Sequence, residues 1–202
     1  MFEGVNVSGK NRLNHAMFLE RQIGFLAGEP VRRKVMDGSD EITEKTSKKK
    51  MAAFVKTAME RLDASVDEET RIKIMENCGY KCAKVNKSVI DAFVARRKKF
   101  GTLDEFLEAE QRNPSAVERL ERQGNIVYQF YTPQSLTRPV RCYCDLLEGL
   151  PSNETISLTY CQCSKGFIQK SWEALTGKPV RVDLLQSVVH GDKECKFAIH
   201  LP

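Results

Sequence analysis

The sequence predicts an α+β protein in which several helices precede a β-β-α-β-β segment that forms an antiparallel sheet packed against helices. Two observations support this fold class. In the first half of the 202-residue chain, apolar residues recur at intervals of three or four, which is typical of helices with one buried face. In the second half, short runs of β-branched and aromatic residues are bounded by Gly, Pro and Asn, which is typical of strands.

The first half of the chain predicts four helices. They cover residues 11–27, residues 43–64, a long stretch from a cap at Ser65 or Asp67 to Gly101, and roughly residues 102–112. The turn-forming residues in 29–40, which include Pro30 and Gly38, predict a loop between the first two helices.

The long third helix carries a stripe that contains two cysteines. Its members are Met75, Cys78, Cys82, Val85, Val89 and Phe93. Because residues four apart share a helix face, Cys78 and Cys82 are expected to point the same way, toward the core. Gly79 lies between them and costs about 1 kcal/mol relative to Ala in a helix. It indicates either a close approach of backbone or ligand, or a break in the helix.

In the second half, residues 126–131 predict the first strand and residues 138–144 the second. On a strand, Cys142 and Cys144 would share one face. Residues 145–158 predict a loop. A helix follows from about 165 to 176, with Cys163 or Ser164 as its cap.

The chain ends in a predicted hairpin. Alternating apolar and polar residues in 180–184 and 195–201 flank a turn at 190–193, so one face of each strand should be buried. On this pattern Cys195 continues the core face of the last strand and is expected to be an ordinary buried residue.

Composition narrows the class of protein. No apolar run is long enough for a transmembrane helix, and the first residues lack the pattern of a signal peptide, so we expect a cytoplasmic protein. The net charge is +5, but acidic residues are interspersed among the basic ones, which favours solvated helix faces over a nucleic-acid surface. In a reducing compartment the seven cysteines indicate metal binding, thiol chemistry or burial rather than disulfides.

Six of the seven cysteines fall in close pairs, which favours a metal site. The pairs are Cys78 with Cys82, Cys142 with Cys144, and Cys161 with Cys163. Zinc needs four ligands, and four thiolates could also hold an iron–sulfur cluster. All six are candidate ligands. The first choice for one zinc site is Cys161 and Cys163 together with Cys78 and Cys82.

The alternative is a thiol enzyme that uses Cys161 or Cys163. Both precede the predicted helix at 165, and a helix N-terminus lowers the pKa of a nearby thiol. Lys165 would add to this effect. Such an enzyme also needs a base. The chain has three histidines, His15, His190 and His200, and neither His190 nor His200 is an obvious partner. Asp145 and Glu148 are possible substitutes.

The last strand carries a motif that resembles a known family. Its residues are Gly191, Asp192, Cys195, Phe197 and Ile199. A Gly-Asp followed by Cys-x-Phe-x-Ile resembles the C-terminal hairpin of the 4-vinyl reductase domain, a presumed small-molecule-binding module. It also resembles relatives that look like aminothiazoline-carboxylate hydrolases. The fold is similar to that of vesicle-tethering subunits of the TRAPP type.

A group of uncharacterised bacterial and archaeal proteins combines this ending with Met-Glu-Asn-Cys-Gly-x-x-Cys-Ala, here residues 75–83, and with two Cys-x-Cys elements. The resemblance implies an α+β domain over residues 66–202, preceded by a helical extension over residues 1–65. It also implies that the protein forms homodimers, with the first two helices as the contact surface.

The resemblance implies ligand binding rather than a particular reaction. We therefore expect a small-molecule- or metal-binding protein of sensory or accessory type that uses the paired cysteines. The alternative is a thiol-dependent hydrolase or reductase of a small cyclic substrate.

Overall fold

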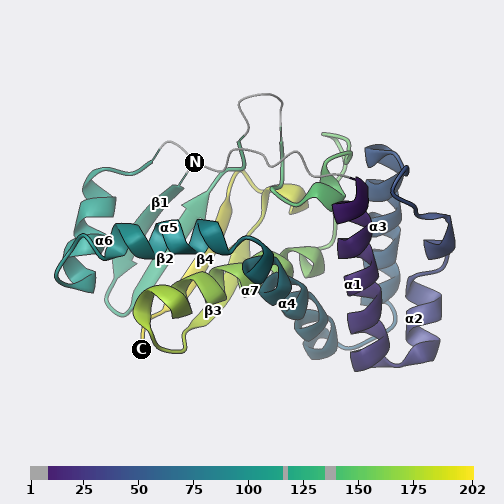
Figure 1. The fold of residues 1–202 in the computed structure, drawn as a ribbon, viewed down its shortest axis with the longest axis horizontal. Coiled ribbons are helices and arrows are strands. Elements are labelled where there is room, and N and C mark those ends of the chain that lie inside the picture. Colours follow the sequence, from purple (N-terminus) through teal and green to yellow (C-terminus); the bar gives the residue numbers. More distant parts are fainter. Residues whose placement is uncertain (1–8, 116–117, 135–139) are drawn as a thin grey trace.

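The computed structural model describes residues 9–115, 118–134 and 140–202. It has an α+β architecture in which the helices of the first half are followed by a four-stranded antiparallel sheet and a long helix (Figure 1). The α-helices are α1 (Gly9–Ala27), α2 (Glu29–Val35), α3 (Lys48–Asp63), α4 (Glu68–Val85), α5 (Lys87–Arg97), α6 (Leu103–Arg112) and α7 (Leu158–Thr176). The strands are β1 (Glu118–Gln123), β2 (Ile126–Tyr131), β3 (Arg181–Gln186) and β4 (Cys195–His200). Short 3-10 turns are η1 (Ser39–Glu41), η2 (Asp145–Leu147) and η3 (Val188–His190).

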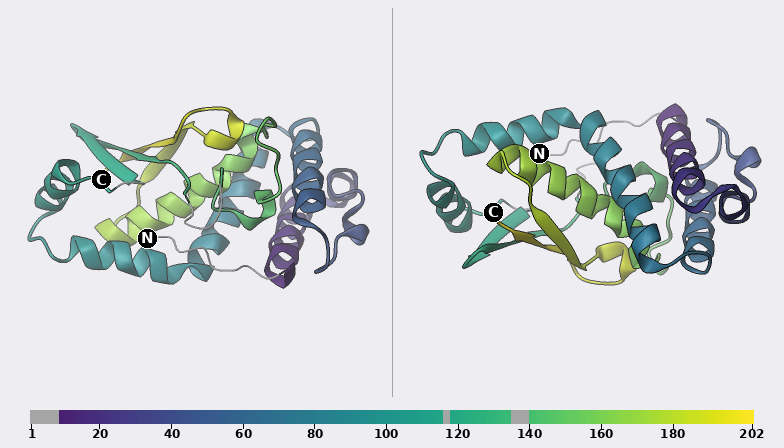
Figure 2. Two further views of the ribbon diagram at one scale, coloured as in Figure 1. Left: turned by 90° about the horizontal axis from the view of Figure 1, so that it is seen from above. Right: turned by 90° about the horizontal axis from the view of Figure 1, so that it is seen from below.

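The sheet has the strand order β1-β2-β4-β3, and every neighbouring pair is antiparallel. The last strand therefore lies between β2 and β3, and the expected C-terminal hairpin is confirmed. Helices α5 and α7 both lie on one face of the sheet (Figure 2). The order of the elements is the predicted β-β-α-β-β, with α7 as the helix.

The identity of one strand was predicted wrongly. The first strand is β1, and its high content of charged residues does not predict a strand. Leu120 is the one buried side chain of β1. It pairs with β2 through a tight turn at Gly124, whose φ of 59° suits glycine. The predicted strand at 138–144 does not form over its described part, residues 140–144, and its remainder lies outside the described residues.

Three helix boundaries also differ from the prediction, each for a local reason. The expected loop contains α2, because Pro30 occupies the first turn, where a helix tolerates proline. The long third helix is two helices, because the side chain and backbone NH of Asn86 both bond the Cys82 carbonyl and end α4. Helix α7 begins at Leu158 rather than about residue 165, because Ser157 is its cap.

Other sequence predictions are confirmed. Asp67 caps α4 by accepting a hydrogen bond of 2.8 Å from the backbone NH of Thr70. The short helix predicted at roughly residues 102–112 is α6, and the structure adds a capping box of Thr102 and Glu105 at its start. No helix among the described residues is long and apolar enough to cross a membrane.

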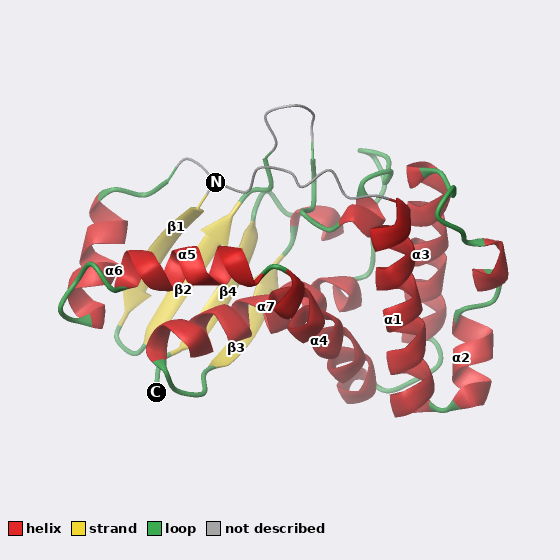
Figure 3. Ribbon diagram, in the orientation of Figure 1, coloured by secondary structure: helices red, strands yellow, loops and turns green. Residues whose placement is uncertain are grey.

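The molecule has two hydrophobic cores, one beside the sheet and one among the N-terminal helices. Figure 3 shows the strands gathered at one end and helices α1, α2 and α3 at the other. The sheet core lies between the sheet and helices α5, α6 and α7, and its largest members are Phe106, Trp172 and Phe197. The helical core lies among α1, α2, α3, α4 and the start of α7, and it contains Ile23, Met59 and Leu62. Residues 140–160 also pack into the helical core. The three N-terminal helices thus share a core with later parts of the chain.

Candidate functional site: a buried thiol cluster

Helices α4 and α7 cross with almost no space between their backbones, and glycines make this possible. A Cβ atom added at Gly79 would lie 2.1 Å from the carbonyl oxygen of Cys163. One added at Gly166 would lie 2.5 Å from the carbonyl oxygen of Glu76. An ion pair of 2.8 Å between Lys165 and Glu76 adds to the crossing. Of the two interpretations of Gly79, the close approach of backbone is confirmed, since α4 continues through it.

This crossing brings cysteines from separate parts of the chain together. Cys78 and Cys82 come from α4, Cys163 comes from α7, and Cys142 and Cys144 come from the segment before η2. Burial raises the pKa of Cys163 well above its usual range, and negative charge on any of the other four would raise it further. Cys163 is therefore the common neighbour of the other four thiols. We call these five residues the thiol cluster.

Burial keeps the thiols of the cluster protonated. It raises the pKa of Cys78 and that of Cys142 to about 12. Burial also raises the pKa of Cys82, and the negative charge of Asp145 raises that pKa further. Desolvation penalises the charged form of an acid, so burial favours the neutral thiol over the thiolate.

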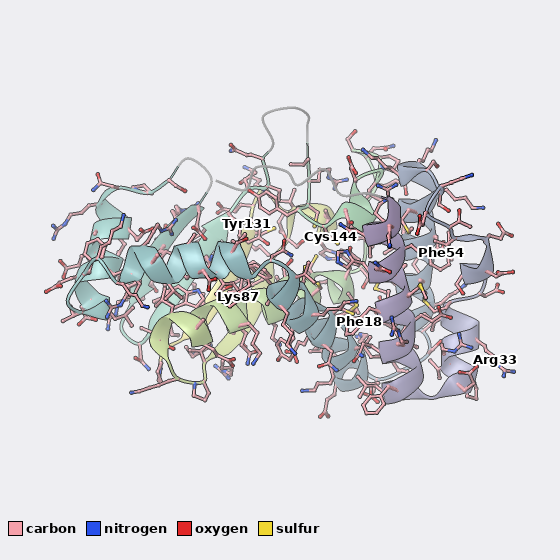
Figure 4. All side chains as sticks on the ribbon, viewed as in Figure 1. Phe18, Arg33, Phe54, Lys87, Tyr131 and Cys144 are labelled. Atoms are coloured by element: carbon pink, nitrogen blue, oxygen red, sulfur yellow. The ribbon has the colours of Figure 1, made fainter. Side chains whose placement is uncertain are left out.

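Asp145 is an acidic residue beside the thiol cluster, and it is only 8% exposed. Its Oδ1 lies 3.0 Å from Nδ1 of His15, which comes from α1. Its Oδ2 is buried and has no hydrogen-bond partner within the described part of the chain. The charge of Asp145 raises the pKa of Cys82, Cys142 and Cys144. Figure 4 shows Cys144, its neighbour in sequence, in the middle of the molecule, between the sheet and α1.

Donors to sulfur hold the cluster in place. The hydroxyl of Tyr160 donates to Sγ of Cys144 over 2.8 Å. The backbone NH of Cys144 donates to Sγ of Cys142 over 3.3 Å. The side-chain amide of Asn86 donates to Sγ of Cys82 over 3.5 Å. Each of these donors would also stabilise a thiolate, as the groups around a metal ligand do.

The sixth predicted ligand, Cys161, faces another part of the molecule. Its Sγ lies 2.8 Å from Oγ of Ser187, and its electrostatic neighbours include Cys142 and Cys195. Residues two apart on a helix point to different faces, so Cys161 and Cys163 diverge. The first-choice set is therefore brought together in part: Cys163 meets Cys78 and Cys82, whereas Cys161 is directed toward the C-terminal hairpin. Cys195 is buried in the sheet core, as predicted.

The premises of the thiol-enzyme alternative differ from the structure. Because α7 begins at Leu158, Cys161 and Cys163 lie inside the helix, and neither Cys163 nor Ser164 is its cap. Burial raises the pKa of Cys161 instead of lowering it. Of the two candidate bases, Glu148 pairs with Lys48 at the surface, and Asp145 lies beside the thiol cluster.

The sequence did not predict the contact between His15 and Asp145, and it indicated Asp145 only as a possible base. A signal for His15 was available, since it lies beside the buried stripe of α1 formed by Arg12, Ala16 and Leu19. The other histidines have structural contacts. His190 bonds the backbone carbonyl of Ile156, and His200 lies against Asp183.

All seven cysteines are free thiols. Across residues 9–115, 118–134 and 140–202, no group of three or more His, Cys, Asp or Glu side chains is placed so that it could hold a metal ion. The thiols of the cluster thus influence one another's pKa, but as the side chains stand they do not form a metal site.

Comparison with known proteins gives a family but no activity. No curated protein matches the sequence. Among solved structures, the fold is weakly similar to the NMR structure of an H-NOX domain from Shewanella oneidensis in its Fe(II)CO ligation state. That match has 13% identity and a TM-score of 0.43, and it covers 93% of this chain and 97% of the other. A family model matches residues 12–202, so the chain belongs to the family of unknown function DUF6144.

Proposed function

We propose that the protein binds a thiophilic metal ion at its thiol cluster and serves in a sensory or accessory role. Zinc is the first candidate, and an iron–sulfur cluster is the alternative. The observation that carries this proposal is the convergence of five cysteines from three chain segments, with Cys163 as their common neighbour. Thiolates are the ligands that zinc and iron–sulfur clusters share.

The sequence predicted a protein that binds either a small molecule or a metal. The close packing around the thiol cluster favours a metal. An ion can enter a packed cluster by replacing thiol protons, whereas a small molecule needs a hollow. Two hollows of the described surface lie beside α6, and neither is lined by a cysteine. The resemblance of the last hairpin to the 4-vinyl reductase domain supports a binding role but does not identify a ligand.

To bind a metal, side chains of the thiol cluster would have to move, because as they stand they form no metal site. A cysteine side chain has one rotatable bond to its sulfur and three staggered positions, so rotation moves the sulfur without moving the helix. The segment that carries Cys142 and Cys144 is a loop and can adjust more than α4 or α7. The glycine crossing, in contrast, already holds Cys82 and Cys163 near each other.

Elemental analysis and a visible absorption spectrum of protein purified without oxygen test this proposal. We expect near-stoichiometric zinc with no visible colour, or iron with a sulfide-type absorption band. Metal-free, colourless protein that takes up neither zinc nor an iron–sulfur cluster after reconstitution would contradict it.

A matched pair of variants assigns the metal to the thiol cluster. Cys82→Ser removes a sulfur of the cluster, and Cys195→Ser makes the same change in the sheet core. We expect Cys82→Ser to lose both the bound metal and the stability that the metal contributes, and Cys195→Ser to retain the metal. Equal metal content in the two variants would place the ion elsewhere.

The thiol enzyme remains the alternative, and one measurement separates it from metal binding. An activated Cys161 or Cys163 should react fast with iodoacetamide in the folded, metal-free protein. With their pKa raised by burial, we expect both to react far more slowly than they do in the unfolded chain. Fast alkylation of a single cysteine in the folded state would favour the enzyme.

A further inference from the structure

We propose that the outer sides of helices α1 and α4 together form a docking surface for a membrane that contains anionic lipids. This surface, called the α1–α4 face below, combines exposed apolar side chains with lysines and an arginine that lack acidic partners among the described residues. The inference concerns a second property of the protein, and its test does not depend on whether the thiol cluster binds a metal.

One stripe of α1 faces outward and contains no acidic residue. Its members recur at intervals of three or four, and each is exposed or half-buried: Lys10, Asn14, Met17, Phe18, Arg21 and Phe25. Phe25 is 82% exposed and Met17 is 45% exposed, whereas Ile23, on the opposite side of the helix, is fully buried. Helix α1 therefore presents large apolar side chains to solvent in the same row as its cations.

Helix α4 adds a second stripe without acidic residues. Its members are Lys73, Asn77, Lys81, Lys84 and Val85. The two stripes adjoin, since Nζ of Lys81 lies 4.2 Å from the ring centre of Phe18. Figures 1 and 2 show α1 and α4 side by side, and Figure 4 shows Phe18 on the same side of the molecule. Val85 is 63% exposed, so the face holds three of the five large apolar side chains that are exposed among the described residues.

The positive charge of this face is not offset by the protein itself. Its cations form no ion pair with a described residue: Lys10, Arg21, Lys73, Lys81 and Lys84. On the neighbouring α2, by contrast, Arg32 and Arg33 both pair with Glu29. Burial and the nearby positive charge of Arg21 lower the pKa of Lys81, as expected where cations gather without an acid. An anionic partner would relieve this repulsion.

The shape and charge of the face favour a membrane over a protein partner. A second copy of the same face would place cations opposite cations in a two-fold contact, which is repulsive. A partner helix binds in an apolar groove, but Phe25 projects from the surface, and the two hollows described above lie beside α6. A membrane surface needs no groove. It accepts aromatic side chains at the headgroup boundary while Lys and Arg contact the anionic headgroups.

Sedimentation of the full-length protein with lipid vesicles tests this inference. We expect binding to phosphatidylcholine vesicles that contain phosphatidylserine, and little binding to vesicles of phosphatidylcholine alone. Binding should weaken as the salt concentration rises, because salt screens the attraction between exposed charges. Absence of binding to the phosphatidylserine vesicles at low salt, or equal binding to both kinds of vesicle, would overturn the proposal.

A matched pair of double variants assigns the binding to this face. Each Lys or Arg near an anionic membrane contributes about fivefold to binding, so Arg21→Gln with Lys84→Gln should weaken binding about 25-fold. Lys178→Gln with Lys193→Gln removes the same charge from exposed positions in the sheet region and should leave binding almost unchanged. An equal loss in both double variants would overturn the proposal, because net charge alone would then explain the attraction.

The apolar contribution has its own readout. Trp172, the one tryptophan of the chain, is fully buried, so a second tryptophan at the surface reports its own surroundings. Emission from Phe25→Trp should shift to shorter wavelength with phosphatidylserine vesicles, whereas Leu185→Trp should give no shift. Phe25→Ser should weaken vesicle binding. An unshifted Phe25→Trp, or a Phe25→Ser variant that loses self-association but binds vesicles as the wild type does, would overturn the proposal and favour a second copy at this face.

Discussion

The two cores of this molecule are built from different chemistry, although α7 passes through both. Its second half carries Trp172 and Leu175 into the sheet core, whose members are aromatic or aliphatic except for Cys195. Its first half carries Tyr160, Cys161 and Cys163 into the helical core, beside the thiol cluster and Asp145. In the sheet core the buried indole NH of Trp172 has a partner, whereas in the helical core Oδ2 of Asp145 has none among the described residues.

This difference indicates a division of tasks along one helix. In the sheet core, the indole NH of Trp172 donates to the side chain of Gln129 over 2.8 Å, and Gln129 in turn donates to Glu118. That chain of bonds contributes to stability. In the helical core, burial raises the pKa of the thiols and an acidic group lies among them, which reduces stability without a ligand. A site that needs a ligand to become stable is typical of metal-binding domains.

The largest effect on stability is expected from Trp172→Ala. Trp172 is fully buried, packs edge-to-face on Phe93 and loses its bond to Gln129 in the variant. We expect the free energy of unfolding to fall by about 3 to 5 kcal/mol, as measured by denaturation in urea. Met59→Ala is the matched change in the helical core, and an equal or larger loss there would contradict our expectation that Trp172→Ala has the largest effect.

Gly79→Ala tests the crossing that forms the thiol cluster. The added methyl would overlap the carbonyl oxygen of Cys163, which is backbone and cannot rotate away. We expect a loss of about 1 to 3 kcal/mol in the free energy of unfolding, together with weaker metal binding, because α4 must move away from α7.

Gly24→Ala is the control for this variant. Gly24 also lies inside a helix, but its added methyl would meet only the flexible side chain of Arg32. That change should be neutral, or stabilising by up to about 1 kcal/mol. If Gly79→Ala were as harmless as the control, close packing at Gly79 would not be what brings Cys82 and Cys163 together.

The sequence predicted the sheet region better than the site. The alternation of apolar and polar residues predicted which side chains of β3 and β4 face the core. A shift of the strand by one residue would move every side chain to the opposite face of the sheet. The charged strand β1 was not predicted, because its composition does not favour a strand. It forms a strand because it pairs with β2 across the turn at Gly124.

The site could be predicted as a set of cysteines but not as an arrangement. Helical spacing correctly placed Cys78 and Cys82 together. Which cysteines face α4 depends on where α7 begins. Because Ser157 caps α7 and the helix begins at Leu158 rather than at about residue 165, Cys161 and Cys163 lie inside it. Asp145 and His15 are 130 positions apart in the chain, so no local pattern could have paired them.

Alkaline pH should weaken the metal-free protein through its helical core. Burial raises the pKa of Cys78 and Cys142 from 9.0 to about 12, so the folded state keeps protons that the unfolded chain releases above pH 9. Stability is therefore full below pH 9 and falls as the pH rises toward 12, by about 1.4 kcal/mol per pH unit for each such thiol.

Denaturation at pH 8, 9 and 10 in the presence of a chelator measures this slope. Cys78→Ala and Cys142→Ala should each make the slope shallower. A slope that is flat between pH 9 and 10 in the wild type would show that the thiols are not desolvated as the packing indicates.

The smallest effect on stability is expected at the two ends of the molecule, where the predicted homodimer can be tested. Phe25 is 82% exposed on α1, and Leu185 is 45% exposed at the sheet end. Each change to Ser should alter the free energy of unfolding by no more than about 0.5 kcal/mol, because neither side chain fills a core. If two copies pair through the first two helices, Phe25→Ser should shift sedimentation toward the monomer, and Leu185→Ser should not. Wild-type protein that sediments as a monomer at every concentration would rule out the dimer, and a shift in Leu185→Ser alone would place the contact at the sheet instead.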